Sequence, residues 1–235
     1  MTRTFDLSST TEGYFPLDVL RELRIIGEQT RVRWVVIGAV ARDLVVHLPL
    51  NHPPQRATHD VDIAVAVEEP DGYARFTQGL ARRRGGEHAF QISRIPVDVL
   101  PTAPADSDGT IEFADGNRLN IIGLAEAAAR PDRVVLPHGV AVEVASIEAQ
   151  CALKLLAWRD RNADDTKDAV DFISLLSAAS EGLYGDEAWS DGASLEANDH
   201  DIFLAGAYRL GSRGRELFTQ HRACAITSIL QDPIT

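Results

Sequence analysis

The chain has 235 residues, of which 45% are hydrophobic, so it can build the core of one large domain or two small ones. Its 23 Lys and Arg against 35 Asp and Glu leave a formal charge of −12, which argues against a protein that coats nucleic acid electrostatically. The start of the chain lacks the apolar core of a signal peptide, and no run reaches the ~20 apolar residues of a membrane span. We therefore expect a cytoplasmic protein without a membrane segment.

Patterns typical of strands and helices alternate in the first part of the chain. We expect residues 1–15 to form a loose leader, followed by a helix that starts at Pro16 and carries leucines at helical spacing. The β-branched run 32–37 predicts a buried strand that ends at Gly38. A second helix is predicted from Val40 to just before Pro49, and residues 51–58 are typical of a loop.

Two aspartates two residues apart mark the next strand, which is predicted over about 60–67. Because side chains at i and i+2 of an extended chain point to the same face, Asp60 and Asp62 would stand side by side. Two carboxylates that close repel each other unless a cation lies between them, and Mg²⁺ or Mn²⁺ prefers such oxygen ligands. The apolar residues at alternate positions would anchor the opposite face of the strand in a core.

A third acidic residue follows in another apolar strand. A helix is predicted over about 71–83, with Arg82, Arg83 and Arg84 at its end, and a strand over 92–100 carries Asp98. A carboxylate in an apolar strand is costly unless it is exposed or paired with a cation. If this strand lies beside the strand of Asp62, Asp98 would complete a site of three carboxylates.

The remaining chain changes from strands to helices. We expect a loop over 101–116, a short helix near 123–129 and a hairpin over 134–144 that turns at 137–139. From residue 146 the apolar spacing becomes helical, with helices predicted from 146, over 166–178 and over 200–218. The fold class is thus an α/β domain over 1–145 followed by a helical domain over 146–235. Cys151 and Cys224 are expected to be free, buried thiols.

The turn after the first buried strand is a candidate phosphate-binding element. Gly38 and Ala39 are small enough for backbone N–H groups to approach a phosphate, and a helix begins there. This helix carries Arg42, which is a further candidate for nucleotide binding. Many α/β turns share this pattern, so it gains weight only beside the carboxylates. Together they predict two-metal, in-line phosphoryl transfer.

These blocks, in this order, resemble the nucleotidyltransferase superfamily with its polymerase-beta-like fold. The segment Arg56-x-Thr58-x-Asp60-Val-Asp62 is similar to the R-x-[ST]-x-D-h-D block of the AbiEii-type nucleotidyltransferase toxins. Two downstream segments, 146–157 and 167–172, resemble the K-x-x-A and [RK]-D-x-x-D blocks of that branch. The resemblance covers about residues 32–176 and implies a mixed sheet flanked by helices, with a helical C-terminal part that completes the nucleotide cleft.

The resemblance also implies roles for individual residues. It assigns metal binding to Asp60, Asp62 and Asp98, phosphate contact to Lys154, positions near the nucleotide to Asp168 and Asp171, and support of the phosphate end to Arg56 and Thr58. One departure is that the family usually has Gly-Gly or Gly-Ser where this chain has Gly38-Ala39. Alanine lacks the serine hydroxyl that can bind a phosphate, although its backbone N–H remains.

Each candidate residue also has a plain structural interpretation. The aspartates of the strand would then form a solvated edge, and Lys154 would extend from an apolar helix to water. Asp168 and Asp171, with Lys167 beside them, would belong to an ordinary solvated helix face. The arginines at 82–84 suit a helix dipole at least as well as an RNA backbone.

The sequence therefore predicts an enzyme that transfers a nucleoside monophosphate from an NTP to an acceptor and releases pyrophosphate, with Mg²⁺ or Mn²⁺ as cofactor. By resemblance the acceptor is a tRNA in a toxin–antitoxin or phage-defence setting, with a cognate antitoxin as partner, although the charge of −12 counts against RNA. A small molecule or a protein hydroxyl stays open as acceptor. The alternative from another class is a non-catalytic module of this fold that binds a nucleotide or a partner protein; Ala39 supports it, and the intact set of three aspartates argues against it.

Overall fold

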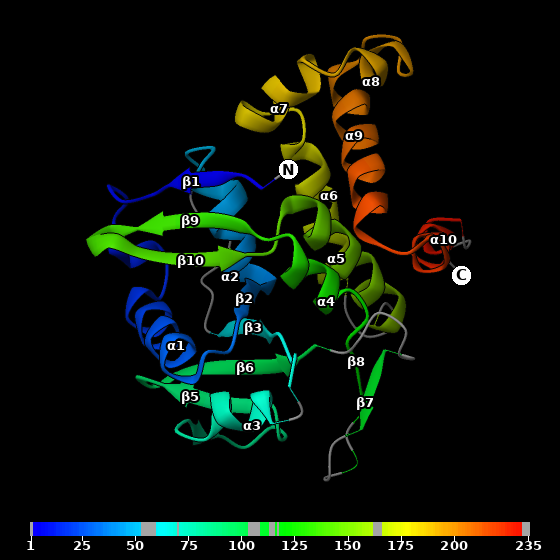
Figure 1. Cartoon of the computed structure of the whole chain (residues 1–235). Coiled ribbons are helices and arrows are strands. Elements are labelled where there is room, and N and C mark those ends of the chain that lie inside the picture. Colours follow the sequence, from blue (N-terminus) through cyan, green and yellow to red (C-terminus); the bar gives the residue numbers. More distant parts are fainter. Residues whose placement is uncertain are drawn as a thin grey trace. The chain divides into compact units, whose positions relative to one another are not determined.

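Short β-branched runs build a mixed, eight-stranded sheet in the N-terminal part of the protein (Figure 1). The computed structural model describes residues 2–52, 60–69, 71–102, 109–112, 116, 118–161 and 166–231. Contacts between residues divide the chain into two compact units, Met1–Ser146 and Ile147–Thr235. A mixed sheet with flanking helices, followed by a helical C-terminal part, is the fold class predicted from the sequence, and that prediction is confirmed.

The sheet combines parallel and antiparallel neighbours. Its strands, in spatial order, are β1 (Thr4–Asp6), β9 (Asp132–Leu136), β10 (Val140–Val144), β2 (Trp34–Ile37), β3 (Val61–Val65), β6 (Ile95–Pro101), β5 (Ala89–Ile92) and β4 (Ala81–Arg82). The pairs β1–β9, β10–β2 and β3–β6 are parallel, and the other neighbours are antiparallel. A separate hairpin joins β7 (Thr110–Glu112) to β8 (Arg118–Asn120).

Helices of the first unit cover this sheet with their apolar sides. They are α1 (Leu17–Thr30), α2 (Gly38–Arg42), α3 (Gly72–Thr77) and α4 (Leu124–Ala129), with a π-helical turn at Asp43–His47. Helix α1 contacts β10 and α3, and its buried residues include Leu20 and Leu23, both fully buried. Helices α2 and α4 contact β2 and β3 instead. The central strands β2 and β3 are therefore enclosed, which suits their almost wholly apolar sequences.

Two predictions for the edges of the sheet are wrong. Residues 1–15 are not merely a leader, because Thr4–Asp6 forms the edge strand β1, held to β9 by a bond from the Arg3 backbone N–H to Asp132 (2.7 Å). The helix predicted to reach residue 83 ends at Thr77, and Arg82 lies in β4 with its guanidinium 5.5 Å from the centre of the Phe90 ring. Strands of two or three residues are too short to produce a periodic signal, so tertiary pairing decides them.

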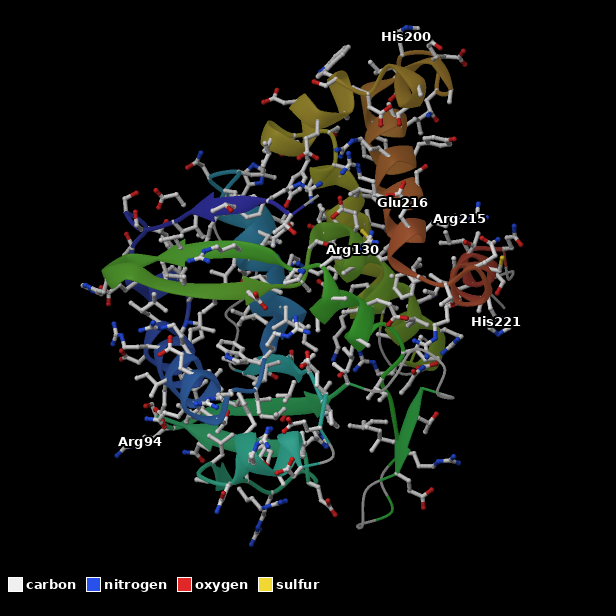
Figure 2. The ribbon with its side chains drawn as sticks, viewed as in Figure 1. Arg94, Arg130, His200, Arg215, Glu216 and His221 are labelled. Carbon is white, nitrogen blue, oxygen red and sulfur yellow. The ribbon has the colours of Figure 1, made fainter. Side chains whose placement is uncertain are left out.

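The strand predicted over 92–100 is present over most of its length as β6, but Ile92 belongs to β5, and a turn at Ser93 and Arg94 joins the two strands in a hairpin. Ser93 and Arg94 both have positive φ (49° and 70°), and Ile92 pairs directly with Ile95. Positive φ at both central residues is the type I′ geometry that matches the twist of a two-residue hairpin. Neither residue is the Asn or Gly that usually signals such a turn, which explains why the sequence did not reveal it. Figure 2 shows the Arg94 side chain extending away from the tip of this hairpin.

The C-terminal unit consists of helices. They are α5 (Ile147–Arg161), α6 (Lys167–Ala178), α7 (Gly182–Trp189), α8 (Gly192–Glu196), α9 (Ile202–Leu217) and α10 (Gln220–Ile229). Helix α5 contacts α6, α9 and α10, and α9 also contacts α7 and α8. Helices α5, α6 and α9 match the predicted helices, whereas α7, α8 and α10 were not predicted. Among the described residues, no helix is both long and apolar enough to cross a membrane.

Aspartate side chains start two helices of this unit. The Asp191 carboxylate accepts a hydrogen bond from the Ser194 N–H (3.1 Å) at the start of α8, and Asp201 accepts one from the Leu204 N–H (3.0 Å) at the start of α9. Such side chains satisfy N–H groups that the first turn of a helix leaves unpaired. The same residues that break periodicity therefore serve as N-caps.

The two cysteines provide a test of the packing around α5. Both thiols are free, but only Cys151 is buried, and Cys224 is exposed, contrary to the expectation of two buried thiols. Burial, with a smaller effect of Glu148, raises the pKa of the Cys151 thiol well above its usual range. We expect a thiol reagent to label one cysteine per native chain and two in denaturant. Cys224→Ala should remove the fast reaction, and fast labelling of native Cys224→Ala would contradict the structure.

Candidate metal centre

Three carboxylates from two neighbouring strands converge in the first unit. Strands β3 and β6 lie side by side (Figure 1), and their parallel register places Asp62 directly opposite Asp98. Asp60 immediately precedes β3. One oxygen from each of Asp60, Asp62 and Asp98 lies within 4.8 Å of the others, with Asp60 exposed and the other two half-buried. The structure thus brings together the three residues that the sequence predicted as metal ligands.

The buried side of each strand explains why the aspartates share one face. The alternate apolar residues are fully buried: Val61, Ile63, Val65, Val97 and Val99. Because side chains alternate across a strand, burying these residues forces Asp62 and Asp98 to the opposite face. A slip of one residue in the register would bury the carboxylates and expose the valines, so the apolar pattern also sets the register.

Gly38 forms a wall of this site. It follows Ile37, which pairs with Asp62 across the antiparallel β2–β3 ladder, and its φ is +68°. A Cβ on Gly38 would overlap the Asp62 carboxylate and would lie 3.0 Å from its carboxyl carbon. Glycine is therefore required here for two reasons, the left-handed backbone and the close approach of Asp62.

The donor set fits a hard divalent cation. Three carboxylate oxygens that converge from separate residues are the ligands that Mg²⁺ and Mn²⁺ prefer. Without a cation, their mutual repulsion opposes the arrangement. A resident positive charge partly offsets this repulsion, because the Arg83 Nη2 group donates a hydrogen bond to Asp98 Oδ1 (2.9 Å). The contact of Arg83 with Asp98 was not predicted from the sequence. The sequence does show a basic residue shortly before a Gly-Gly turn, followed by a strand that carries an aspartate.

The predicted phosphate-binding residues of the first unit differ in their placement. Gly38 and Ala39 are half-buried at the start of α2. Arg42 is only 1% exposed, and its guanidinium lies 3.8 Å from the Asp43 carboxylate in a buried cluster with His47, so it is not presented to solvent. A direct nucleotide contact by Arg42 stays a prediction. Arg56 and Thr58 lie outside the described residues.

The other predicted residues form a second charged cluster, within the helical unit. Lys154 on α5 donates to Asp168 Oδ1 (3.0 Å) and lies 2.7 Å from Asp171 Oδ2, both on α6. Arg161 binds the other Asp168 oxygen at 2.7 Å. Both carboxylates are buried, and buried charges are stable only when they are paired. The cluster therefore ties α5 to α6, and the phosphate-binding role of Lys154 stays a prediction.

No family model and no curated protein matches the chain. Among solved structures, the antibiotic-resistance factor ANT(2'')-Ia has a TM-score of 0.42 at 16% identity, over 78% of this chain and 97% of that chain. A nucleotidyltransferase candidate from Thermotoga maritima has 0.40 at 19% identity, over 66% and 92%. An antigenic nucleotidyltransferase-like protein from Paracoccidioides brasiliensis has 0.40 at 16% identity, over 86% and 94%. The resemblance to AbiEii-type toxins stays a prediction.

Gly38→Ala should perturb both stability and the carboxylate site. We expect a loss of about 1–3 kcal/mol in the free energy of unfolding, because alanine is strained at this φ and its methyl group displaces Asp62. Gly139→Ala is the matched control, since Gly139 has a similar φ of +71° but no atom within 4 Å of an added Cβ. Mn²⁺ binding, followed by electron paramagnetic resonance, should weaken only in Gly38→Ala; equal weakening in both variants would contradict the role of Gly38.

Lys154→Met should destabilise the protein by about 3 kcal/mol, because it removes a positive charge that contacts two buried carboxylates, Asp168 and Asp171. Urea unfolding followed by circular dichroism measures this change. Arg159→Met on the same helix is the control, since its ion pair with Asp160 is solvent-exposed and worth little. If the two variants were equally stable, Lys154 would not be the counter-charge of the α5–α6 cluster.

Proposed function

We propose that this protein is a metal-dependent nucleotidyltransferase that transfers a nucleoside monophosphate from an NTP to an acceptor. The observation that carries the proposal is the convergence of Asp60, Asp62 and Asp98, whose oxygens lie within 4.8 Å of one another. Carboxylates held this close by a buried sheet are suited to bind cations that in turn grip phosphate oxygens. Asp62, Asp98 and Gly38 are half-buried, so the site has a defined floor rather than a fully solvated strand face.

The residues of the chain have distinct parts in this reaction. Asp60, Asp62 and Asp98 would hold Mg²⁺ or Mn²⁺, which when bound supplies Lewis-acid stabilisation of the charge that develops on the phosphates. Gly38 leaves room for Asp62 to take up its position. The acceptor hydroxyl releases its proton to solvent as its oxygen forms a bond to the α-phosphorus, and the bond from the α-phosphorus to the bridging oxygen breaks. Pyrophosphate leaves with that electron pair.

The net charge of the protein indicates which class of acceptor molecule it favours. A net charge of −12 repels polyanions at long range and favours neutral or cationic molecules. We therefore place a small molecule or a protein hydroxyl before RNA. A tRNA acceptor, a toxin–antitoxin setting and a cognate antitoxin follow only from the resemblance of the sequence blocks to AbiEii-type toxins.

Label transfer tests the proposal directly. The full chain is incubated with each α-³²P-labelled NTP and Mg²⁺ or Mn²⁺, in the presence of total RNA, extracted proteins or pooled small metabolites in separate reactions. We expect label in one acceptor pool, its loss on chelation of the metal, and a decrease of about 100-fold or more in Asp62→Asn. Glu143→Gln, an exposed carboxylate change on β10, is the control and should retain activity.

Two outcomes would contradict the enzyme. Transfer that survives in Asp62→Asn at the wild-type rate would place the chemistry elsewhere. Nucleotide binding without transfer to any pool would favour the alternative, a non-catalytic module that holds a nucleotide or a partner protein.

A further inference from the structure

Arg83 reaches the third carboxylate across a row of paired residues. The Arg83 N–H bonds the Ala89 carbonyl oxygen (2.9 Å), Ala89 pairs with Asp98, and Asp98 pairs with Asp62. Residues in register across a sheet place their side chains on one face. Ala89 carries only a methyl group, so the long Arg83 side chain can pass over it from the sheet edge to Asp98. The ion pair is thus a product of the sheet register.

The pair between Arg83 and Asp98 is incomplete. A single contact joins the Arg83 Nη2 atom to Asp98 Oδ1 at 2.9 Å, with the side chains 35% and 25% exposed. The Arg83 Nε group is buried and has no hydrogen-bond partner among the described residues. Two parallel bonds would make a strong pair, whereas one half-exposed contact is worth little. A cation that engages all three carboxylates can therefore replace this contact.

The charges around the site also favour replacement of the Arg83 contact by a metal ion. The three carboxylates carry three negative charges within a few ångströms, and Arg83 forms an ion pair with one of them, Asp98. This guanidinium lowers the repulsion when no metal is bound, but its positive charge opposes a divalent cation at the same oxygens. One residue therefore stabilises the metal-free site and weakens metal binding.

We propose that Arg83 is the resident counter-cation of the three-carboxylate site and that it leaves Asp98 when a divalent cation binds. This inference rests on the proposed metal site and identifies Arg83 as a positioning residue that acts through Asp98. The release of Arg83 makes metal affinity lower than the carboxylates alone would provide. It also frees a positive side chain at the edge of the site where the anionic NTP would bind.

Mn²⁺ affinity of the full chain, measured by electron paramagnetic resonance of the free ion, tests the inference. Arg83→Gln should tighten Mn²⁺ binding by about 3- to 10-fold, because the competing charge is removed while a hydrogen-bonding side chain remains. Arg83→Lys should stay within about twofold of wild type, since it keeps the charge. The rise in melting temperature on adding saturating Mn²⁺ should be larger in Arg83→Gln than in wild type.

Arg84→Gln is the matched control. Arg84 adjoins Arg83 and is exposed, so Arg84→Gln removes the same formal charge from a side chain that water and salt screen. If Arg83→Gln and Arg84→Gln tightened Mn²⁺ binding equally, the change in net charge alone would explain the effect. That result would overturn the inference. Weaker binding in both Arg83→Gln and Arg83→Lys would show that Arg83 only supports the local structure, and would also overturn it.

The proposed function and the inference fail in different ways. If wild-type protein binds no Mn²⁺, the metal site is absent, and both are overturned. If wild type binds Mn²⁺, Asp62→Asn does not, and Arg83→Gln is unchanged, the metal site stands and only the inference about Arg83 is overturned.

Discussion

The parallel pairing of β3 with β6 is the constraint on which the candidate site depends. It sets Asp62 opposite Asp98, and it is itself set by valines and an isoleucine that are fully buried on the other face. Burying an aliphatic side chain contributes roughly 1.5–3 kcal/mol, so several of them outweigh the repulsion of half-exposed carboxylates at an effective dielectric near 20. The core therefore holds together charges that would separate on an unsupported strand.

The strands on either side of β3 and β6 supply two more residues that shape the site. On one side, β2 delivers Gly38 against the Asp62 carboxylate, where any Cβ would overlap it. On the other side, β5 interposes Ala89, which is small enough for Arg83 to cross. Across the sheet, two small residues thus flank the paired aspartates: Gly38 lies beside Asp62, and Ala89 lies beside Asp98. A site built in this way depends on register at four strands, so a distortion of any one of them would reach the carboxylates.

The sequence pattern predicted the central strands of the sheet better than its edge strands. The spacing of Asp60 and Asp62 and the alternation of valines identify a half-buried strand from period 2 alone, and the turn at Gly38 follows from the end of a β-branched run. Arg83 was assigned to a helix end because the preceding residues have helical spacing, whereas the edge pairing of β4 with β5 decides its position. Edge strands of two or three residues depend on a partner that sequence periodicity does not contain.

The two charged clusters of the chain are unlike each other, and the difference bears on function. In the helical unit, Lys154 and Arg161 offset Asp168 and Asp171, so two cations meet two buried anions and the cluster is closed. In the sheet unit, Asp60 is exposed, Asp62 and Asp98 are half-buried, and Arg83 makes a single contact with Asp98. Structural ion clusters minimise uncompensated charge because removal from water is costly. The sheet cluster instead gathers three carboxylates on a rigid support, an arrangement that suits the cation binding proposed above.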